Sequence, residues 1–252
     1  MPRQRKQTTD IKAEDMHKRR RGSWVAQMWM YKDLSGIDWD AQPACFITNY
    51  VLALQCFVFA VVTLLISPQQ SFIWYGTYFF SVGATAAAGA FLHHLAYNAL
   101  IVSPSSTVPF LGISMNQKTL DNWIDASWRI VMSFSMLSHL ALFVISCENT
   151  MYSWIISGAF CYILFGIYAV VKKNTIFILV GFLPPLFFLG YNFCTALSTQ
   201  SALYGIVALI LSLASGIVQS LGVSPSKRFF NHNALSHVIL SGSAFFMLLS
   251  TI

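Results

Sequence analysis

The chain has 252 residues, of which 56% are hydrophobic and only 10% are charged. A soluble domain carries roughly a quarter charged residues, so this sequence has too little polar surface to cover a water-soluble globule. Its 15 Lys and Arg exceed its 9 Asp and Glu, but nine of the basic residues lie before residue 33. A basic tail on an apolar body indicates an orientation signal and contact with membrane lipids, and it argues against nucleic acid as the partner.

The first 44 residues are polar and charged, and they precede a predicted transmembrane domain at residues 45–252. They contain a polybasic run at residues 18–21. Two interpretations of residues 23–34 remain open, an interfacial helix on the cytosolic leaflet or a disordered tail that directs insertion. The helical interpretation rests on apolar side chains near one face, Trp24, Val25, Met28 and Trp29.

Seven later stretches are long and apolar enough to cross the hydrocarbon, which takes about 20 helical residues. They are residues 45–66, 72–96, 124–146, 152–171, 175–196, 202–222 and 233–251. Most of the connections are short, so we expect consecutive helices to be antiparallel neighbours. The segment at residues 103–118 is rich in Pro, Ser and Asn and predicts a loop. The sequence therefore predicts an all-α membrane protein, a seven-transmembrane helix bundle with a cytosolic N-terminal tail.

The basic residues predict the orientation of this bundle. With seven spans, the N-terminal tail shares one side with the loops after the second, fourth and sixth helices, and these segments hold fourteen of the 15 Lys and Arg. The segments on the other side hold none, because the remaining residue, Arg129, lies inside the third predicted helix. Loops rich in Lys and Arg stay in the cytosol. We therefore expect a cytosolic N-terminus and a lumenal or extracellular C-terminus.

Ionisable side chains at membrane depth are candidates for function, because they are costly to place in hydrocarbon. In this chain they are His93, His94, Asp121, Asp125, Arg129, His139, His232 and His237. The predicted topology brings all but His139 to the cytosolic ends of the second, third and seventh helices. Imidazole and carboxylate groups suit zinc, and a catalytic zinc needs three protein ligands and a water. This convergence predicts a metal site.

Helical spacing limits which of these residues can share one ion. His232 and His237 are five residues apart, or about 140° around a helix, so His232 must precede the helix if both bind. His93 and His94 are adjacent, so we expect only one to point inward. The small residues before His94 favour His94, whereas a rival stripe that contains Gly89 favours His93.

Each candidate also has a plain structural interpretation. Histidines near helix ends often bond a backbone carbonyl, and Asp125 and Arg129 have the i,i+4 spacing of an intrahelical ion pair. Pro184 and Pro185 lie inside the fifth predicted helix, where they indicate either a hinge beside a cavity or a static packing kink.

Two segments are similar to motifs of a known superfamily. Residues 230–238, with sequence FNHNALSHV, look like the start of the last helix of the alkaline ceramidases and the progestin and adipoQ receptors, sometimes called the CREST hydrolases. Residues 89–94, with sequence GAFLHH, look like the end of their second helix. Members carry Ser-x-x-x-His in the second helix, an Asp near the third, and His-x-x-x-His in the seventh. This chain departs from the pattern, since Asn233 stands four residues before His237 and Gly89 or Ala90 stands at the Ser position.

The resemblance implies a zinc-dependent hydrolase of lipid amides, or a degenerate relative of one. Zinc would be bound by His237, by His94 or His93, and by His232, while Asp125 or Asp121 would accept a proton. Membrane lipids would then be both surroundings and substrate. The alternatives are a non-enzymatic seven-helix receptor or scaffold, and a transporter whose polar path contains Asp125, Arg129 and His139.

Overall fold

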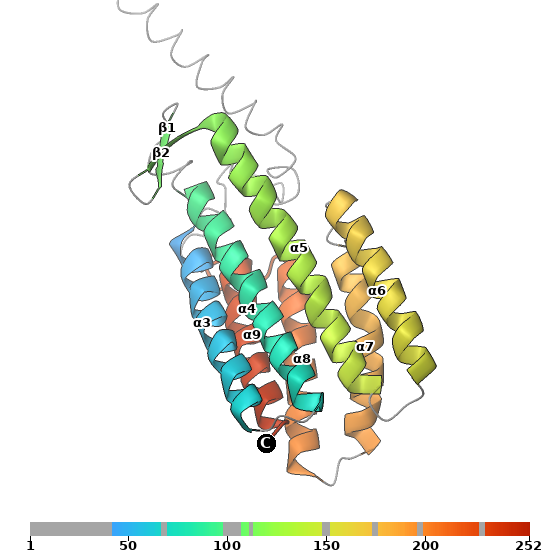
Figure 1. The fold of residues 1–252 in the computed structure, drawn as a ribbon. Helices are drawn as coiled ribbons and strands as arrows, with labels where there is room; N and C mark the ends of the chain where they lie inside the picture. The colour runs from blue at the N-terminus through green and yellow to red at the C-terminus, as the bar shows by residue number, and fades with distance from the viewer. Residues whose placement is uncertain are drawn as a thin grey trace, which may run out of the picture. The chain divides into compact units, whose positions relative to one another are not determined.

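The computed structural model describes residues 42–66, 70–97, 107–110, 113–147, 152–172, 176–195, 199–226 and 230–252 (Figure 1). The predicted interfacial helix and the polybasic run lie outside these described residues. The described part contains seven long helices. They are α3 (Pro43–Ile66), α4 (Gln70–Tyr97), α5 (Gln117–Cys147), α6 (Tyr152–Lys172), α7 (Ile176–Thr195), α8 (Gln200–Leu221) and α9 (His232–Leu249).

Each of the seven predicted stretches is a helix, and the largest difference is at the start of α5. This helix begins at Gln117, whereas the apolar run predicted a start at residue 124. Its first two turns are polar, so hydropathy marks where the helix becomes apolar and not where it begins. The sequence between α4 and α5 also differs from the predicted loop. It contains an antiparallel hairpin in which β1 (Thr107–Phe110) pairs with β2 (Ile113–Asn116).

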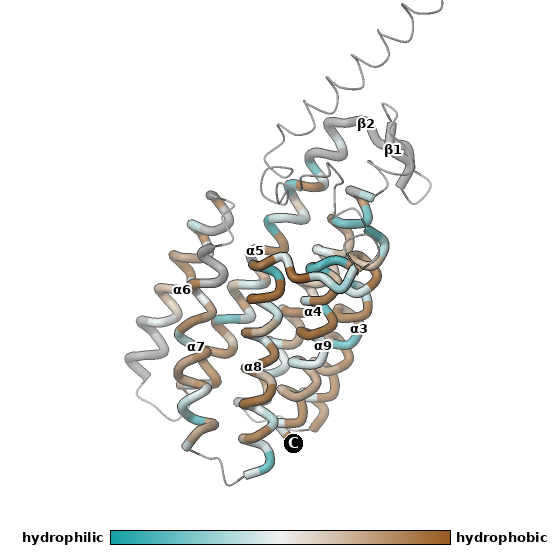
Figure 2. Tube along the Cα trace, turned by 180° about the vertical axis from the view of Figure 1, so that it is seen from behind, coloured by the Kyte–Doolittle hydropathy of each residue, from teal (hydrophilic) through white to brown (hydrophobic). Residues whose placement is uncertain are grey.

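Four helical segments in the described part are long and apolar enough to cross a membrane. They are Pro43–Ile66, Asn122–Cys147, Gln200–Gln219 and His232–Leu249. Shorter apolar stretches lie in α6 and α7, at Gly158–Tyr168 and Val180–Thr195. The protein is therefore a multi-pass membrane protein. Hydrophobic residues dominate along these helices in Figure 2.

The helices form a bundle in which chain neighbours are mostly neighbours in space. α4 packs between α3 and α5, α7 contacts α5 and α8, and α9 packs between α8 and α3 (Figure 1). The contact between α3 and α9 closes the ring, while α6 packs on α5 and α7 at its edge. The core joins side chains of six helices, including Leu52, Phe79 and Met247.

The outward faces of the bundle are strongly apolar. Leu65 is 80% exposed and Phe187 is 70% exposed, and many other large aliphatic and aromatic side chains point away from the core. In water such a surface would be an aggregation liability, whereas lipid tails solvate it. The bundle is thus apolar on its outward faces as well as in its core, and its buried polar side chains are a minority.

The two prolines of α7 do not interrupt the helix, which continues through Pro184 and Pro185. Pro185 has no N–H to donate to the carbonyl of Gly181, four residues earlier. The hydroxyl of Tyr162 on α6 donates to that carbonyl oxygen at 2.7 Å. A neighbouring helix therefore replaces one of the two backbone donors that the prolines remove, which favours a static packing role over the hinge.

Candidate functional site

The start of α3, the end of α4 and the start of α9 meet at one end of the bundle. The thiol of Cys45 on α3 donates to the Asn231 side-chain oxygen at 3.0 Å, although the two residues are far apart in sequence. Thr48 on α3 contacts His237 on α9. A Cβ added at Gly89 on α4 would lie 3.5 Å from the amide nitrogen of Asn49 on α3. Polar side chains of three helices thus share one level of the bundle.

His93 and His237 are the predicted site residues that the structure brings together. Their ring centroids lie 6.4 Å apart, with the ring planes at 59°. His93 is only 2% exposed. Because His93 follows Gly89 by one helical turn and Gly89 faces α3, the stripe that contains Gly89 is the one that carries the inward histidine.

His232 lies beside this pair and begins α9. The helix runs from His232, with Asn231 as its N-cap, so His232 and His237 are both regular helical residues. They point about 140° apart, and this removes the option that His232 precedes the helix. His232 is buried, and both His232 and His93 interact electrostatically with His237.

Asparagines complete the surroundings of the histidines. The Asn231 side chain accepts from the backbone N–H of Ala234 at 3.0 Å and so caps α9. Asn233 accepts from the side-chain amide of Gln219 on α8 at 3.3 Å. Both asparagines are buried. Sequence reasoning missed Asn231, although an Asn just before an apolar helix is a common capping signal. It also missed Cys45 and Thr48, which carry no local signal.

His94 takes a different place from the inward position that the small-residue stripe favoured. Its ring stacks on Phe46 with centroids 4.5 Å apart and planes at 15°. The hydroxyl of Tyr50 lies 3.5 Å from His94 Nδ1, and Tyr50 is 41% exposed. His94 therefore belongs to an aromatic group on the outer side of α3 and α4. Adjacent helical residues point about 100° apart, so only His93 faces the bundle.

The acidic candidates lie on α5. Asp125 accepts from the Arg129 side chain at 2.8 Å, which is the intrahelical ion pair that the spacing indicated. The two side chains are 28% and 53% exposed, respectively. Asp121 lies one turn earlier on α5, and its side chain is outside the described part. His139 lies further along the helix against Phe182 of α7, with ring centroids 5.3 Å apart.

The arrangement fits zinc in part. Two histidines on one tetrahedral zinc place their ring centroids about 5 Å apart, from Zn–N bonds near 2 Å, so the pair is close to ligating distance. Among the residues that the structure describes, however, no group of three or more His, Cys, Asp and Glu side chains is gathered to hold a metal. His232 is a further imidazole that interacts with His237, and it would have to turn toward the pair.

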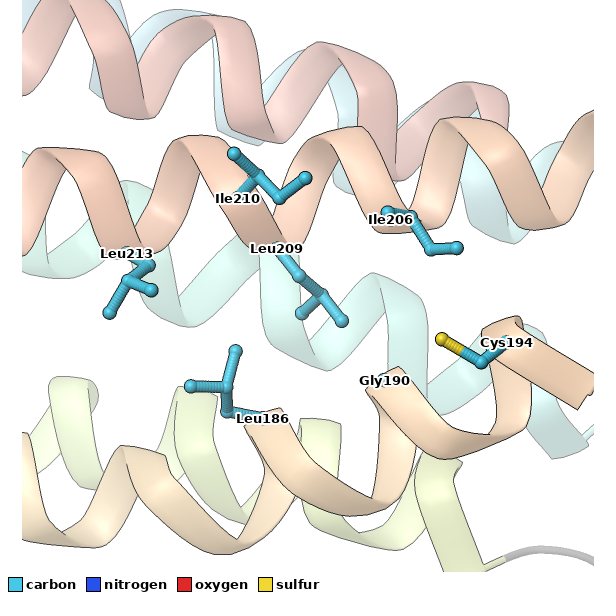
Figure 3. Close-up of a pocket in the computed structure, with 7 residues that line it drawn as sticks. All are labelled: Leu186, Gly190, Cys194, Ile206, Leu209, Ile210 and Leu213. Atoms are coloured by element: carbon cyan, nitrogen blue, oxygen red, sulfur yellow. The ribbon is translucent and has the colours of Figure 1, made fainter.

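A shallow groove of about 190 Å³ lies elsewhere, between α7 and α8 (Figure 3). Leu186, Gly190 and Cys194 line it from α7, and aliphatic side chains of α8 line the opposite wall. Its lining contains no histidine or carboxylate. The groove therefore suits hydrocarbon, and the histidine pair is not part of its lining.

A family model matches residues 44–252. The chain belongs to a family of unknown function, DUF6962. No curated protein and no solved structure matches it significantly. The DUF6962 match begins at the start of α3 and contains all seven described helices. The histidine pair, its asparagines and Thr48 thus lie inside the family region, whereas the basic N-terminal tail lies before it.

Proposed function

We propose that this DUF6962 protein spans the membrane seven times, with a cytosolic N-terminus and a lumenal or extracellular C-terminus. The seven helices and the segregation of Lys and Arg to alternate loops support this topology. Glycosylation-acceptor tags at the two ends test it. The C-terminal tag should be modified and the N-terminal tag should not, and the reverse pattern would exclude the topology.

We propose further that the protein is a zinc-dependent hydrolase of a lipid amide. The observation that carries the proposal is the approach of His93 and His237 from two different helices. In the proposed site these two imidazoles bind zinc, and His232 would complete the set only if the first turn of α9 rearranges, because it points about 140° away from His237 in the helix. A zinc ion supplies hydrolytic chemistry by lowering the pKa of a coordinated water to about 7.

The other candidate residues have proposed roles in this site. In the proposed topology the histidines lie at the cytosolic ends of their helices, near the depth of lipid headgroups and of an amide linkage. Asp125 or Asp121, at the cytosolic end of α5, would accept a proton. The Arg129 side chain donates to the Asp125 carboxylate at 2.8 Å and so fixes its orientation.

Metal analysis of the purified protein tests the ligand assignment, and the adjacent histidines offer a matched control. We expect about one zinc per chain in the wild type and in His94→Ala, because His94 lies in the outer aromatic group. We expect zinc to be lost in His93→Ala and His237→Ala. A wild type without zinc would exclude the proposal, as would equal loss of zinc in all three variants.

A non-enzymatic receptor or scaffold is the second candidate. The observation that favours it is the lack of a gathered three-ligand group among the described residues. In that case the buried histidines and asparagines would serve to fix the packing of α9. Folded protein that binds no zinc, with unchanged stability when zinc is added, would support this candidate over the hydrolase.

A further inference from the structure

The hydroxyl of Thr48 has three polar neighbours and only one proton to share among them. It lies 2.7 Å from the carbonyl oxygen of Ala44 and 3.2 Å from that of Cys45. It also lies 3.2 Å from Nδ1 of His237 on α9. The direction of each hydrogen bond therefore follows from where that one proton points.

The short contact with Ala44 decides the direction. Two oxygen atoms at 2.7 Å repel each other unless a proton lies between them, and a carbonyl oxygen has none to give. The Thr48 hydroxyl must therefore donate to Ala44, four residues earlier, as Ser and Thr commonly do inside helices. Its proton is then used, so the contact with His237 is attractive only if Nδ1 of His237 donates to the Thr48 oxygen.

We infer that Thr48 is a positioning residue that holds His237 as the Nδ1–H tautomer and leaves a lone pair on Nε2. In a neutral imidazole one nitrogen donates and the other accepts, so the bond at Nδ1 fixes both. Nε2 then becomes the atom that binds a metal, and this last step rests on the zinc function proposed above. Ligating histidines are commonly oriented in this way through their other ring nitrogen.

A second contact, further along the same two helices, fixes how α9 is rotated against α3. Gln55 on α3 donates to the carbonyl of Ser241 on α9 at 3.0 Å, and the Ser241 hydroxyl donates back to the Gln55 side chain. Gln55 lies two turns after Thr48, and Ser241 lies one turn after His237. This reciprocal pair therefore sets the rotation of α9 against α3, and with it the approach of His237 to Thr48.

Histidine NMR on the metal-free full-length protein in lipid nanodiscs tests the tautomer directly. The nitrogen and carbon shifts of an imidazole distinguish the Nδ1–H form from the Nε2–H form, and His237→Ala assigns the signal. Wild type and Thr48→Ser should both show the Nδ1–H form. Thr48→Val, which has the same shape without the hydroxyl, should shift His237 toward the Nε2–H form. Zinc affinity should fall about 10- to 100-fold in Thr48→Val and recover in Thr48→Ser.

The two proposals fail separately in this experiment. An Nε2–H form in the wild type, or an identical spectrum in Thr48→Val, would overturn the role of Thr48. A wild type in the Nδ1–H form that binds no zinc would support Thr48 as the tautomer-setting residue and would overturn only the zinc function. The folded state of Thr48→Val is checked by its remaining histidine signals, because the His94 ring stacks on Phe46 and the His139 ring lies against Phe182.

Discussion

The two sides of α9 and the contacts among α5, α6 and α7 hold helices together in different ways. α9 joins its neighbours through pairs of polar side chains, with His237 on Thr48 and Ser241 on Gln55 toward α3, and Ser243 on Ser212 toward α8. These pairs are found in addition to bonds from side chains to backbone carbonyls on the same interfaces. In the other region, Tyr162 and Asn192 each donate to a backbone carbonyl, of Gly181 and Ser146 respectively.

This difference matters because lipid removes the hydrophobic driving force between helices in a membrane. A bond from a side chain to a backbone carbonyl satisfies that carbonyl, but it does not require any particular residue at the accepting position. A bond between two side chains specifies both residues, their rotation and, for histidine, the tautomer. The α9 region therefore has the specificity that a chemical site needs, and the α5–α7 region has the features of a supporting scaffold.

The largest effect that would sharpen this comparison is expected at the caps of α8 and α9. Asn231→Ala removes the cap of α9 and also the acceptor of the buried Cys45 thiol, so we expect a loss of about 2–3 kcal/mol in the free energy of unfolding. Thr199→Ala removes the matching cap of α8, an exposed Thr whose hydroxyl accepts from the Ala202 backbone N–H at 3.2 Å. That variant should lose about 0.5–1 kcal/mol.

Equilibrium unfolding in mixed micelles measures both variants side by side. Equal losses would mean that Asn231 acts only as a cap and that the buried contact with Cys45 contributes nothing. Such a result would weaken the view that the start of α9 is specified more strongly than the rest of the bundle.

A smaller effect is expected in the α5–α7 region. Tyr162→Phe leaves the Gly181 carbonyl without its donor beside Pro185, and a buried unpaired carbonyl costs about 1–2 kcal/mol. Tyr191→Phe is the matched control on α7, because Tyr191 is 69% exposed and its change should stay within about 0.5 kcal/mol. Neither variant should alter zinc content. Zinc loss in Tyr162→Phe would show that the two regions are coupled and not independent.

The sequence predicted the helices well because each helix has a local signal. That signal is a run of apolar residues that ends at polar or helix-breaking residues. The hairpin between α4 and α5 was missed because its residues read as a loop rich in turn formers. The residue types and the predicted topology also placed His93 and His237 at the same depth in the bundle. The choice between His93 and His94 could not be made in advance, since it depends on the rotation of α4 by about 100°. That rotation is set by packing against Asn49 and Phe46 of α3, which no pattern within α4 reveals.

The smallest effect on stability is expected at the Asp125–Arg129 pair, where substitutions can distinguish a catalytic role of Asp125 from a structural one. The pair is partly exposed, so breaking it should change the free energy of unfolding by only about 0.3–0.5 kcal/mol in either variant. Asp125→Asn removes the carboxylate. Arg129→Gln breaks the same ion pair but keeps the carboxylate.

If Asp125 accepts the proton in lipid-amide hydrolysis, Asp125→Asn should lose turnover about 10²- to 10⁴-fold, the usual contribution of a general base. Arg129→Gln should retain most of its turnover, measured as fatty acid released from a lipid amide in nanodiscs. Equal turnover in the two variants would remove Asp125 from the chemistry and leave it as a structural partner of Arg129, which would place the α5 contribution with the scaffold and not with the site.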